Sequence, residues 1–265
     1  MKIIKQIAPS GKNSMKSLTM ELESLIYTVI SAQYPVNWDS GAVTRSLFSG
    51  MKQLFDNKII RTPGNAIQTS WRIKRLKTDP EKILGDIAFL VQIAYHDGQV
   101  VRGAALLDTA LKDPGKNTFS SLNKNRIKKL TSTASHASLL LYDYDPICGM
   151  AFPSTVESII GSHPHTWNSW MPYTYAATVP AGLMMSIDNK TTGLYKISLP
   201  LSYQLCYRYL YGLDLDHSVA SLETAAGLRP DRGIMKYLIM ISISHGGAEP
   251  LTSFDYNDKL YTDFE

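Results

Sequence analysis

The chain has 265 residues with a formal net charge of +4, and its 44% hydrophobic and 19% charged residues exclude a disordered protein. Its two cysteines, Cys148 and Cys206, exclude a disulfide framework and a multi-cysteine zinc site, so we expect a cytoplasmic location. The N-terminus lacks the apolar segment of a signal peptide and no run reaches the roughly 18 apolar residues needed to cross a bilayer, so we expect no membrane partner.

The first part of the chain predicts two helices and a strand. Apolar residues recur at helical spacing over residues 17–32, and Pro35 prevents that helix from continuing. A second helix is predicted over residues 40–56, with Asp39 or Ser40 as its N-cap. Apolar and polar side chains alternate loosely over residues 66–77, which predicts a strand with one polar face.

The next part predicts a long hairpin followed by a helix and a strand. Residues 83–95 and 100–109 predict two strands, joined by the tight turn His96-Asp97-Gly98. A helix with a basic outer face is predicted over residues 117–130, and a short buried strand over residues 137–142. This order of elements predicts the α/β class with a mixed α+β sheet.

From residue 148 onward the pattern is less regular and richer in aromatic residues, among them Trp167 and Trp170. It predicts strands over 184–187, 194–199 and 235–243 and helices over 201–211 and 219–226. We therefore divide the chain into a core, residues 1–147, and a C-terminal extension, residues 148–265, that packs on the core. Because Tyr and Trp are favoured at protein interfaces, we expect a homo-oligomer or a protein partner.

Each strand of the predicted hairpin carries one acidic residue. Asp86 follows Gly85 near the start of the first strand, and Asp108 lies near the end of the second. Both lie beside apolar runs, where an unpaired carboxylate would be costly. Two carboxylates brought together on neighbouring strands can hold a divalent metal ion. The alternative is that each acid is an exposed residue at the end of its strand.

Gly85-Asp86 on one strand and Asp108-Thr109-Ala110 on the next resemble the motif of the PD-(D/E)xK nuclease superfamily, and the order of elements over residues 40–145 resembles its fold. The resemblance implies a restriction-endonuclease-like core that hydrolyses DNA phosphodiester bonds. It also implies Mg²⁺ or Mn²⁺ ions held by Asp86, Asp108 and a backbone carbonyl near Thr109. In the superfamily a third carboxylate commonly comes from the preceding helix. We choose Asp39 over Glu21 and Glu23, with a helix N-cap as the alternative role of Asp39.

Ala110 stands where the superfamily has its catalytic lysine. One explanation is a lysine replaced by alanine to trap an inactive form. Another is that the role has moved to Lys112, which shares a strand face with Ala110. The third is a degenerate site kept for binding.

The resemblance implies a metal-dependent endonuclease, such as a restriction or anti-phage defence effector that a partner licenses. The alternative function is a catalytically degenerate nuclease-fold subunit that binds nucleic acid or scaffolds a defence complex. A third alternative is a purely protein-binding component. The chain has no phosphate-binding loop of the Walker type, no dinucleotide fingerprint and no nucleophile elbow, so we do not expect an ATPase, a dehydrogenase or a serine hydrolase.

Two dense basic segments lie in the same part of the chain as the acids. We expect them to contact the phosphate backbone of DNA, and the alternative is that they are solvated faces. Their members are Arg72, Lys74, Arg75 and Lys77 in the first segment and Lys124, Arg126, Lys128 and Lys129 in the second.

Overall fold

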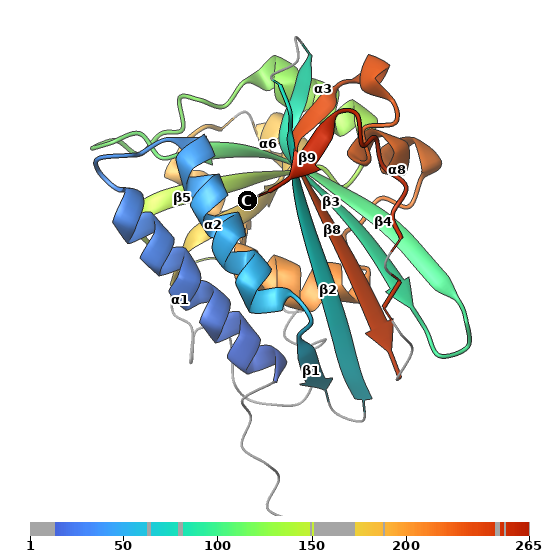
Figure 1. The fold of residues 1–265 in the computed structure, drawn as a ribbon. Helices are drawn as coiled ribbons and strands as arrows, with labels where there is room; N and C mark the ends of the chain where they lie inside the picture. The colour runs from blue at the N-terminus through green and yellow to red at the C-terminus, as the bar shows by residue number, and fades with distance from the viewer. Residues whose placement is uncertain are drawn as a thin grey trace, which may run out of the picture.

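The computed structural model describes residues 14–62, 65–78, 82–148, 150, 173–187, 189–246, 250–251 and 253–264. Within these ranges the chain forms one twisted sheet with helices on both faces (Figure 1). Some neighbouring strands run parallel and others antiparallel. The predicted class, a mixed α+β sheet, is therefore confirmed. No helix of the described residues is long and apolar enough to cross a membrane.

The described part of the sheet has nine strands. They are β1 (Ile59–Thr62), β2 (Asn65–Leu76), β3 (Ile83–Ala94), β4 (Val100–Leu111), β5 (Ser138–Ile147), β6 (Thr174–Pro180), β7 (Leu199–Pro200), β8 (Ile234–His245) and β9 (Tyr261–Asp263). Their order across the sheet is β1-β2-β8-β3-β4-β5-β6-β7, with β9 paired to β2. The pairs β3–β8 and β4–β5 are parallel, and the other pairs are antiparallel.

One face of the sheet, here called the first face, is covered by α1 (Met15–Gln33) and α2 (Ser40–Phe55). Both helices form where the apolar spacing predicts them. Ser14 caps α1 by accepting a hydrogen bond from the Ser17 amide, and Asp39 caps α2 in the same way. The helical segment formed by α7 (Leu201–Tyr203), η2 (Gln204–Arg208) and η3 (Tyr209–Tyr211) packs into the same apolar core.

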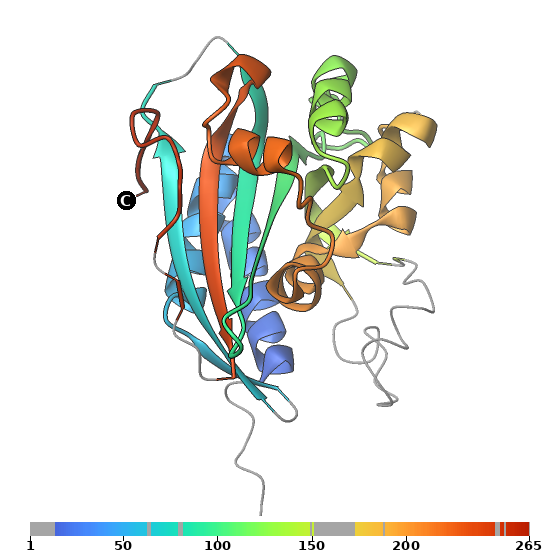
Figure 2. The same ribbon diagram turned by 90° about the vertical axis from the view of Figure 1, so that its right-hand side faces the viewer.

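The opposite face, here called the second face, is covered by α3 (Lys124–Thr133), α6 (Ala181–Ile187) and α8 (Val219–Ala225). Figure 2 shows α8 lying across the long strands on the side opposite to α1 and α2. The short helical turns η1 (Thr192–Ile197) and η4 (Pro230–Arg232) complete the described helical elements. The sheet therefore separates two apolar cores, and a side chain on a long strand belongs to one or the other.

The structure corrects three of the predicted elements. The strand predicted over 184–187 is wrong because these residues belong to α6, and the strand predicted over 194–199 is wrong for residues 194–197, which belong to η1, whereas Leu199 begins β7. Short apolar runs of this length do not distinguish a strand from a buried helix. The helix predicted from residue 117 begins only at Lys124, where Asn123 supplies the cap, and the preceding turn is held by hydrogen bonds from Thr118 and Ser120 to Asp113.

The two parts into which the sequence was divided share one sheet. Strand β8, from the C-terminal extension, lies between β2 and β3 of the core and pairs with both along most of its length. Residues Trp167 and Trp170 lie outside the described ranges. In the described ranges the extension therefore supplies a central strand of the sheet, in addition to helices that pack on it.

Candidate functional site

The hairpin of β3 and β4 brings Asp86 and Asp108 together. Ile87 pairs with Leu107, so the same antiparallel register places Asp86 opposite Asp108. Both carboxylates are almost fully buried, with side chains 6% and 3% exposed. Thr109 lies beside them, and both its amide (2.9 Å) and its hydroxyl (2.6 Å) donate hydrogen bonds to Asp86 Oδ2. Asp86 and Asp108, here called the acidic pair, are thus buried residues and not exposed strand ends.

Arg126 of α3 bridges the acidic pair. Its Nη2 lies 2.8 Å from Asp86 Oδ2 and also contacts Asp108 Oδ1, while its Nε donates to Asp108 Oδ2 at 2.8 Å. Lys236 of β8 adds a second cation, with Nζ 2.9 Å from Asp86 Oδ1. Two buried negative charges are therefore balanced by two positive charges from other elements of the fold.

The cations decide the protonation state of Asp86. Burial alone would raise the pKa of this carboxyl, but the charges of Arg126 and Lys236 and the hydrogen bond from Thr109 outweigh burial and lower it. Asp86 is therefore ionised in the folded protein at neutral pH. A charged carboxylate this deeply buried depends on Arg126 and Lys236 for its stability.

Gly85 lets α3 approach the acidic pair closely. A Cβ atom on this residue would lie 2.7 Å from Met235 Cε, 3.1 Å from the Leu107 carbonyl oxygen and 3.1 Å from Leu130 Cδ1. Leu130 is one turn after Arg126 on α3, so the same close approach that buries Leu130 delivers the guanidinium to the carboxylates. The glycine before the acid thus has a packing role.

The donor set fits Mg²⁺ or Mn²⁺ poorly. Both ions prefer several oxygen ligands, whereas the oxygens of the acidic pair are already contacted by Arg126 and Lys236. The described residues contain no group of three or more His, Cys, Asp or Glu side chains that could hold a metal ion. The Thr109 amide and hydroxyl also donate to Asp86 Oδ2, one of the oxygens that the resemblance assigns to a metal ion. A metal ion would have to displace the arginine.

Neither Ala110 nor Lys112 places a cation at the acidic pair. Ala110 is fully buried in the apolar core of the second face. The explanation that Lys112 takes the role of the motif lysine is corrected, because Lys112 pairs with other carboxylates. Its Nζ lies 3.1 Å from Asp143 Oδ1 and 2.7 Å from Asp145 Oδ2, because β5 presents these carboxylates directly beside the end of β4.

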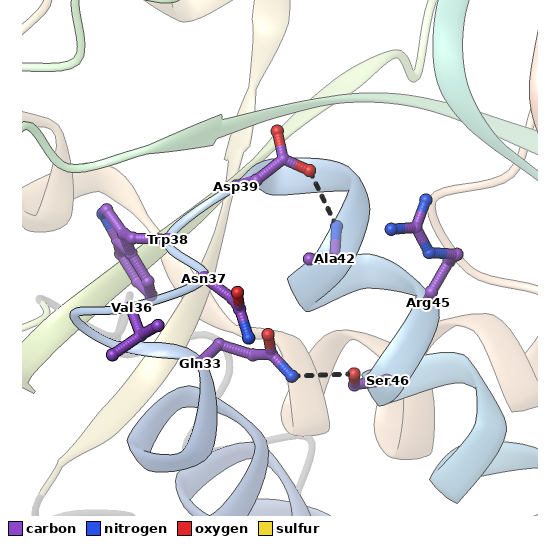
Figure 3. Close-up of a pocket in the computed structure, with 8 residues that line it drawn as sticks. All are labelled: Gln33, Val36, Asn37, Trp38, Asp39, Ala42, Arg45 and Ser46. Carbon is purple, nitrogen blue, oxygen red and sulfur yellow. Dashed lines mark hydrogen bonds between the residues drawn. The ribbon is translucent and has the colours of Figure 1, made fainter.

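Asp39 does not join the acidic pair. Its Oδ1 accepts a hydrogen bond of 2.9 Å from the Ala42 amide at the start of α2, which covers the first face (Figure 3). The N-cap interpretation of Asp39 therefore describes its contacts. The two other candidates for a third carboxylate also interact elsewhere. Glu21 pairs with Lys58, and Glu23 accepts hydrogen bonds from Thr174 and Ser202.

The first basic segment is split between the two faces of the sheet, because successive side chains of β2 point to opposite faces. Arg72, Arg75 and Lys77 are exposed, and the Lys77 ammonium donates a hydrogen bond to the Asp258 carbonyl oxygen. Lys74 is half-buried on the second face and pairs with Asp263 at 2.7 Å. Arg75 follows Trp71 and Ile73, which face α2, and so belongs to the first face. The segment therefore does not form one continuous basic surface.

The second basic segment divides in the same way along α3. Lys124, Lys128 and Lys129 are exposed on the outer side of the helix, whereas Arg126 turns inward. The helical spacing predicts this inward orientation, because Arg126 lies one turn before the buried Leu130 and so shares its side of the helix. Lys236 was missed altogether, since β8 is far from the hairpin in sequence.

Similarity to known proteins does not test the expected nuclease activity. Comparison of the chain with protein-family models, with curated proteins and with solved structures finds no significant match in any of the three.

Proposed function

We propose that this chain is a nucleic-acid-binding protein with a nuclease-like fold whose acidic pair is neutralised by the protein itself. The observation that carries the proposal is the contact of one guanidinium, that of Arg126, with both Asp86 and Asp108. In the nuclease superfamily that the hairpin resembles, the corresponding acids hold a metal ion. Here an arginine occupies the position between them.

The charges around the acidic pair support this proposal. A divalent cation entering the site would meet the positive charges of Arg126 and Lys236 within contact distance of the same oxygens. Ala110, buried among apolar side chains, supplies no ammonium for orienting water or stabilising a phosphate. The arrangement suits a structural ion cluster better than a site of hydrolysis.

The outer side of α3 is the surface we assign to nucleic acid. Lys128 and Lys129 are exposed there, on the same helix whose Arg126 contacts the acidic pair. Flexible ammonium groups of this kind contact phosphates and position a strand without reading its sequence. A DNA ligand remains the first expectation, in keeping with the resemblance.

The experiment is a titration of a fluorescent DNA duplex at several salt concentrations. Lys128→Ala/Lys129→Ala is compared with Arg61→Ala/Lys196→Ala, which removes the same charge from exposed positions on β1 and η1. We expect the α3 variant to weaken binding and to reduce the slope of log K against log salt by roughly 1 to 2, because each lost phosphate contact contributes about 0.9. Equal binding by the two variants, or no binding by the unaltered protein at low salt, refutes the proposal.

A metal-dependent nuclease is the second candidate, and the convergence of the acidic pair favours it. Among the described residues Arg126 is the contact that both acids share, and its side chain is 28% exposed, so substrate binding could draw it away. This candidate predicts that Mn²⁺ stabilises the unaltered protein against heat and that Asp86→Asn abolishes plasmid cleavage. Our proposal predicts neither a thermal shift with Mn²⁺ nor cleavage.

A further inference from the structure

A cavity of about 350 Å³ lies between α2 and the end of β2, on the first face of the sheet. Its described lining consists of Arg45, Ser46, Ser49, Arg75 and Phe264. We call it the arginine cleft. A neighbouring cavity of about 620 Å³, shown in Figure 3, shares Arg45 and Ser46 with the cleft and extends past Gln33, Asn37 and Trp38.

The fold directs the polar side chains of both elements toward the cleft. On α2, Arg45 and Ser49 are four residues apart, so they project on the same side of the helix, away from the buried Val43 and Leu47. On β2, Arg75 continues the row of Trp71 and Ile73, which faces α2. The cleft is therefore on the opposite face of the sheet from α3 and is separate from the surface assigned to nucleic acid above.

Neither arginine of the cleft has a charge partner in the part of the chain that the structure describes. Among the described residues, no ion pair or hydrogen bond of the Arg45 or Arg75 guanidinium is found. Lys74, adjacent to Arg75, contrasts with them because it is paired with Asp263 and lies over the ring of Tyr256. No carboxylate belongs to the described lining of the cleft. Both arginines are exposed, and two guanidinium groups that line one cavity give it a positive potential that favours an anion.

Hydroxyl groups add hydrogen-bond donors to the two positive charges. Ser46 Oγ accepts a hydrogen bond of 3.1 Å from Gln33 Nε2, which leaves its own O–H free to donate. Ser49 is exposed at the opening. The nearest acid of the adjoining cavity, Asp39, already directs Oδ1 to the Ala42 amide (Figure 3).

We propose that the arginine cleft binds a phosphate group. The planar guanidinium matches the oxygens of phosphate in a bidentate way, and serine hydroxyls complete such sites. The adjoining cavity, with the amides of Gln33 and Asn37 and the indole of Trp38, receives the remainder of the phosphate-bearing molecule. That molecule is either a nucleic acid strand or a free nucleotide, and the inference does not require the function proposed above.

The test compares Arg45→Ala/Arg75→Ala with the control Arg61→Ala/Lys196→Ala, which loses the same charge at exposed positions outside both cavities. The first probe is inorganic phosphate, titrated against chloride at constant ionic strength while thermal unfolding is followed. We expect phosphate to stabilise the unaltered protein and the control. We expect the cleft variant to bind phosphate at least roughly tenfold more weakly. No stabilisation of the unaltered protein, or an equal loss in the control, overturns the proposal.

Two further probes identify the source of the phosphate. A single-stranded oligonucleotide that loses affinity in the cleft variant but not in the control supports a nucleic acid strand as the ligand. A mononucleotide that loses affinity in the cleft variant, with oligonucleotide binding unchanged, supports a free nucleotide. If the α3 variant binds the DNA duplex as well as the unaltered protein does, the proposed function is refuted. The arginine-cleft proposal is not affected by that result, because the phosphate titration does not depend on DNA binding by α3.

Discussion

Replacing Arg126 by methionine tests the central contact of the candidate site. Methionine has nearly the helix propensity of arginine, so the change mainly removes the guanidinium. Of the described contacts, Asp108 then loses its charge partner, and Asp86 retains those with Lys236 and Thr109. Two carboxylates with side chains 3% and 6% exposed would face each other across the hairpin.

The size of the effect follows from leaving a buried charge unpaired. Removing one partner of a buried ion pair costs about 3–5 kcal/mol. In a chain of this size each 1 kcal/mol lowers Tm by about 2–4 °C, so we expect a decrease of roughly 6–20 °C at pH 7. The matched control is Lys128→Met, which removes an exposed positive charge from the same helix and should change stability by less than about 0.5 kcal/mol.

The pH dependence gives a second measure of the same contact. In the unaltered protein the pKa of Asp86 is lowered, so its contribution to stability is present above the ordinary carboxyl pKa and is lost as the pH falls through the folded-state value. In Arg126→Met, burial dominates and at least one carboxyl takes up a proton on folding. The difference between variant and unaltered protein should therefore shrink as the pH falls from 7 toward 4.

The assay is urea unfolding at pH 7 and pH 4.5, with and without Mn²⁺. We expect Mn²⁺ to stabilise Arg126→Met, because its acidic pair has an unbalanced charge, and to leave Lys128→Met unchanged. The reasoning is refuted if Arg126→Met unfolds at the same urea concentration as Lys128→Met and shows no dependence on pH.

Three other substitutions test individual contacts. Gly85→Ala places a Cβ 3.1 Å from the Leu107 carbonyl oxygen and should cost roughly 1–3 kcal/mol in urea unfolding, and an unchanged midpoint would contradict the close packing. Burial raises the pKa of Glu23 to about 7 despite its two hydroxyl hydrogen bonds, so stability should fall as the pH rises from about 4.5 to 7. Glu23→Gln should remove that slope in a pH series of unfolding curves, and a slope equal to that of the unaltered protein would exclude this carboxyl. Lys112→Met leaves the buried Asp143 without its cation and should cost about 3–5 kcal/mol by the same measurement, whereas a loss below about 1 kcal/mol would show that the pair contributes little.

The hairpin of β3 and β4 was predictable from the sequence because its signals are local. Apolar runs identify the two strands, and the tight turn at His96-Asp97-Gly98 determines their register, which places Asp86 opposite Asp108. The convergence of the acidic pair could therefore be predicted without any long-range information. The same holds for α1 and α2, whose caps and apolar spacing lie within each helix.

Neither cation that contacts the acidic pair was predicted, and the physical reason differs between Lys236 and Arg126. Lys236 reaches Asp86 only because β8 pairs with β3, and a pairing between strands so distant in sequence leaves no local signal. The inward orientation of Arg126 could have been predicted from its spacing of one helical turn from Leu130. A dense basic run suggests an exposed helix face unless each residue is assigned to a side of the helix. The errors at 184–187 and 194–197 arise from short apolar runs that suit either a strand or a buried helix.

The position of β8 between β2 and β3 has a consequence for how the protein is made. The ribosome releases residues 65–94 long before residues 234–245, so the two strands that flank β8 are synthesised without the neighbour that joins them. Their unpaired edges are exposed to other chains during that interval, when aggregation competes with folding. A nascent chain that stalls before β8 can assemble neither the central part of the sheet nor the Lys236 contact to Asp86.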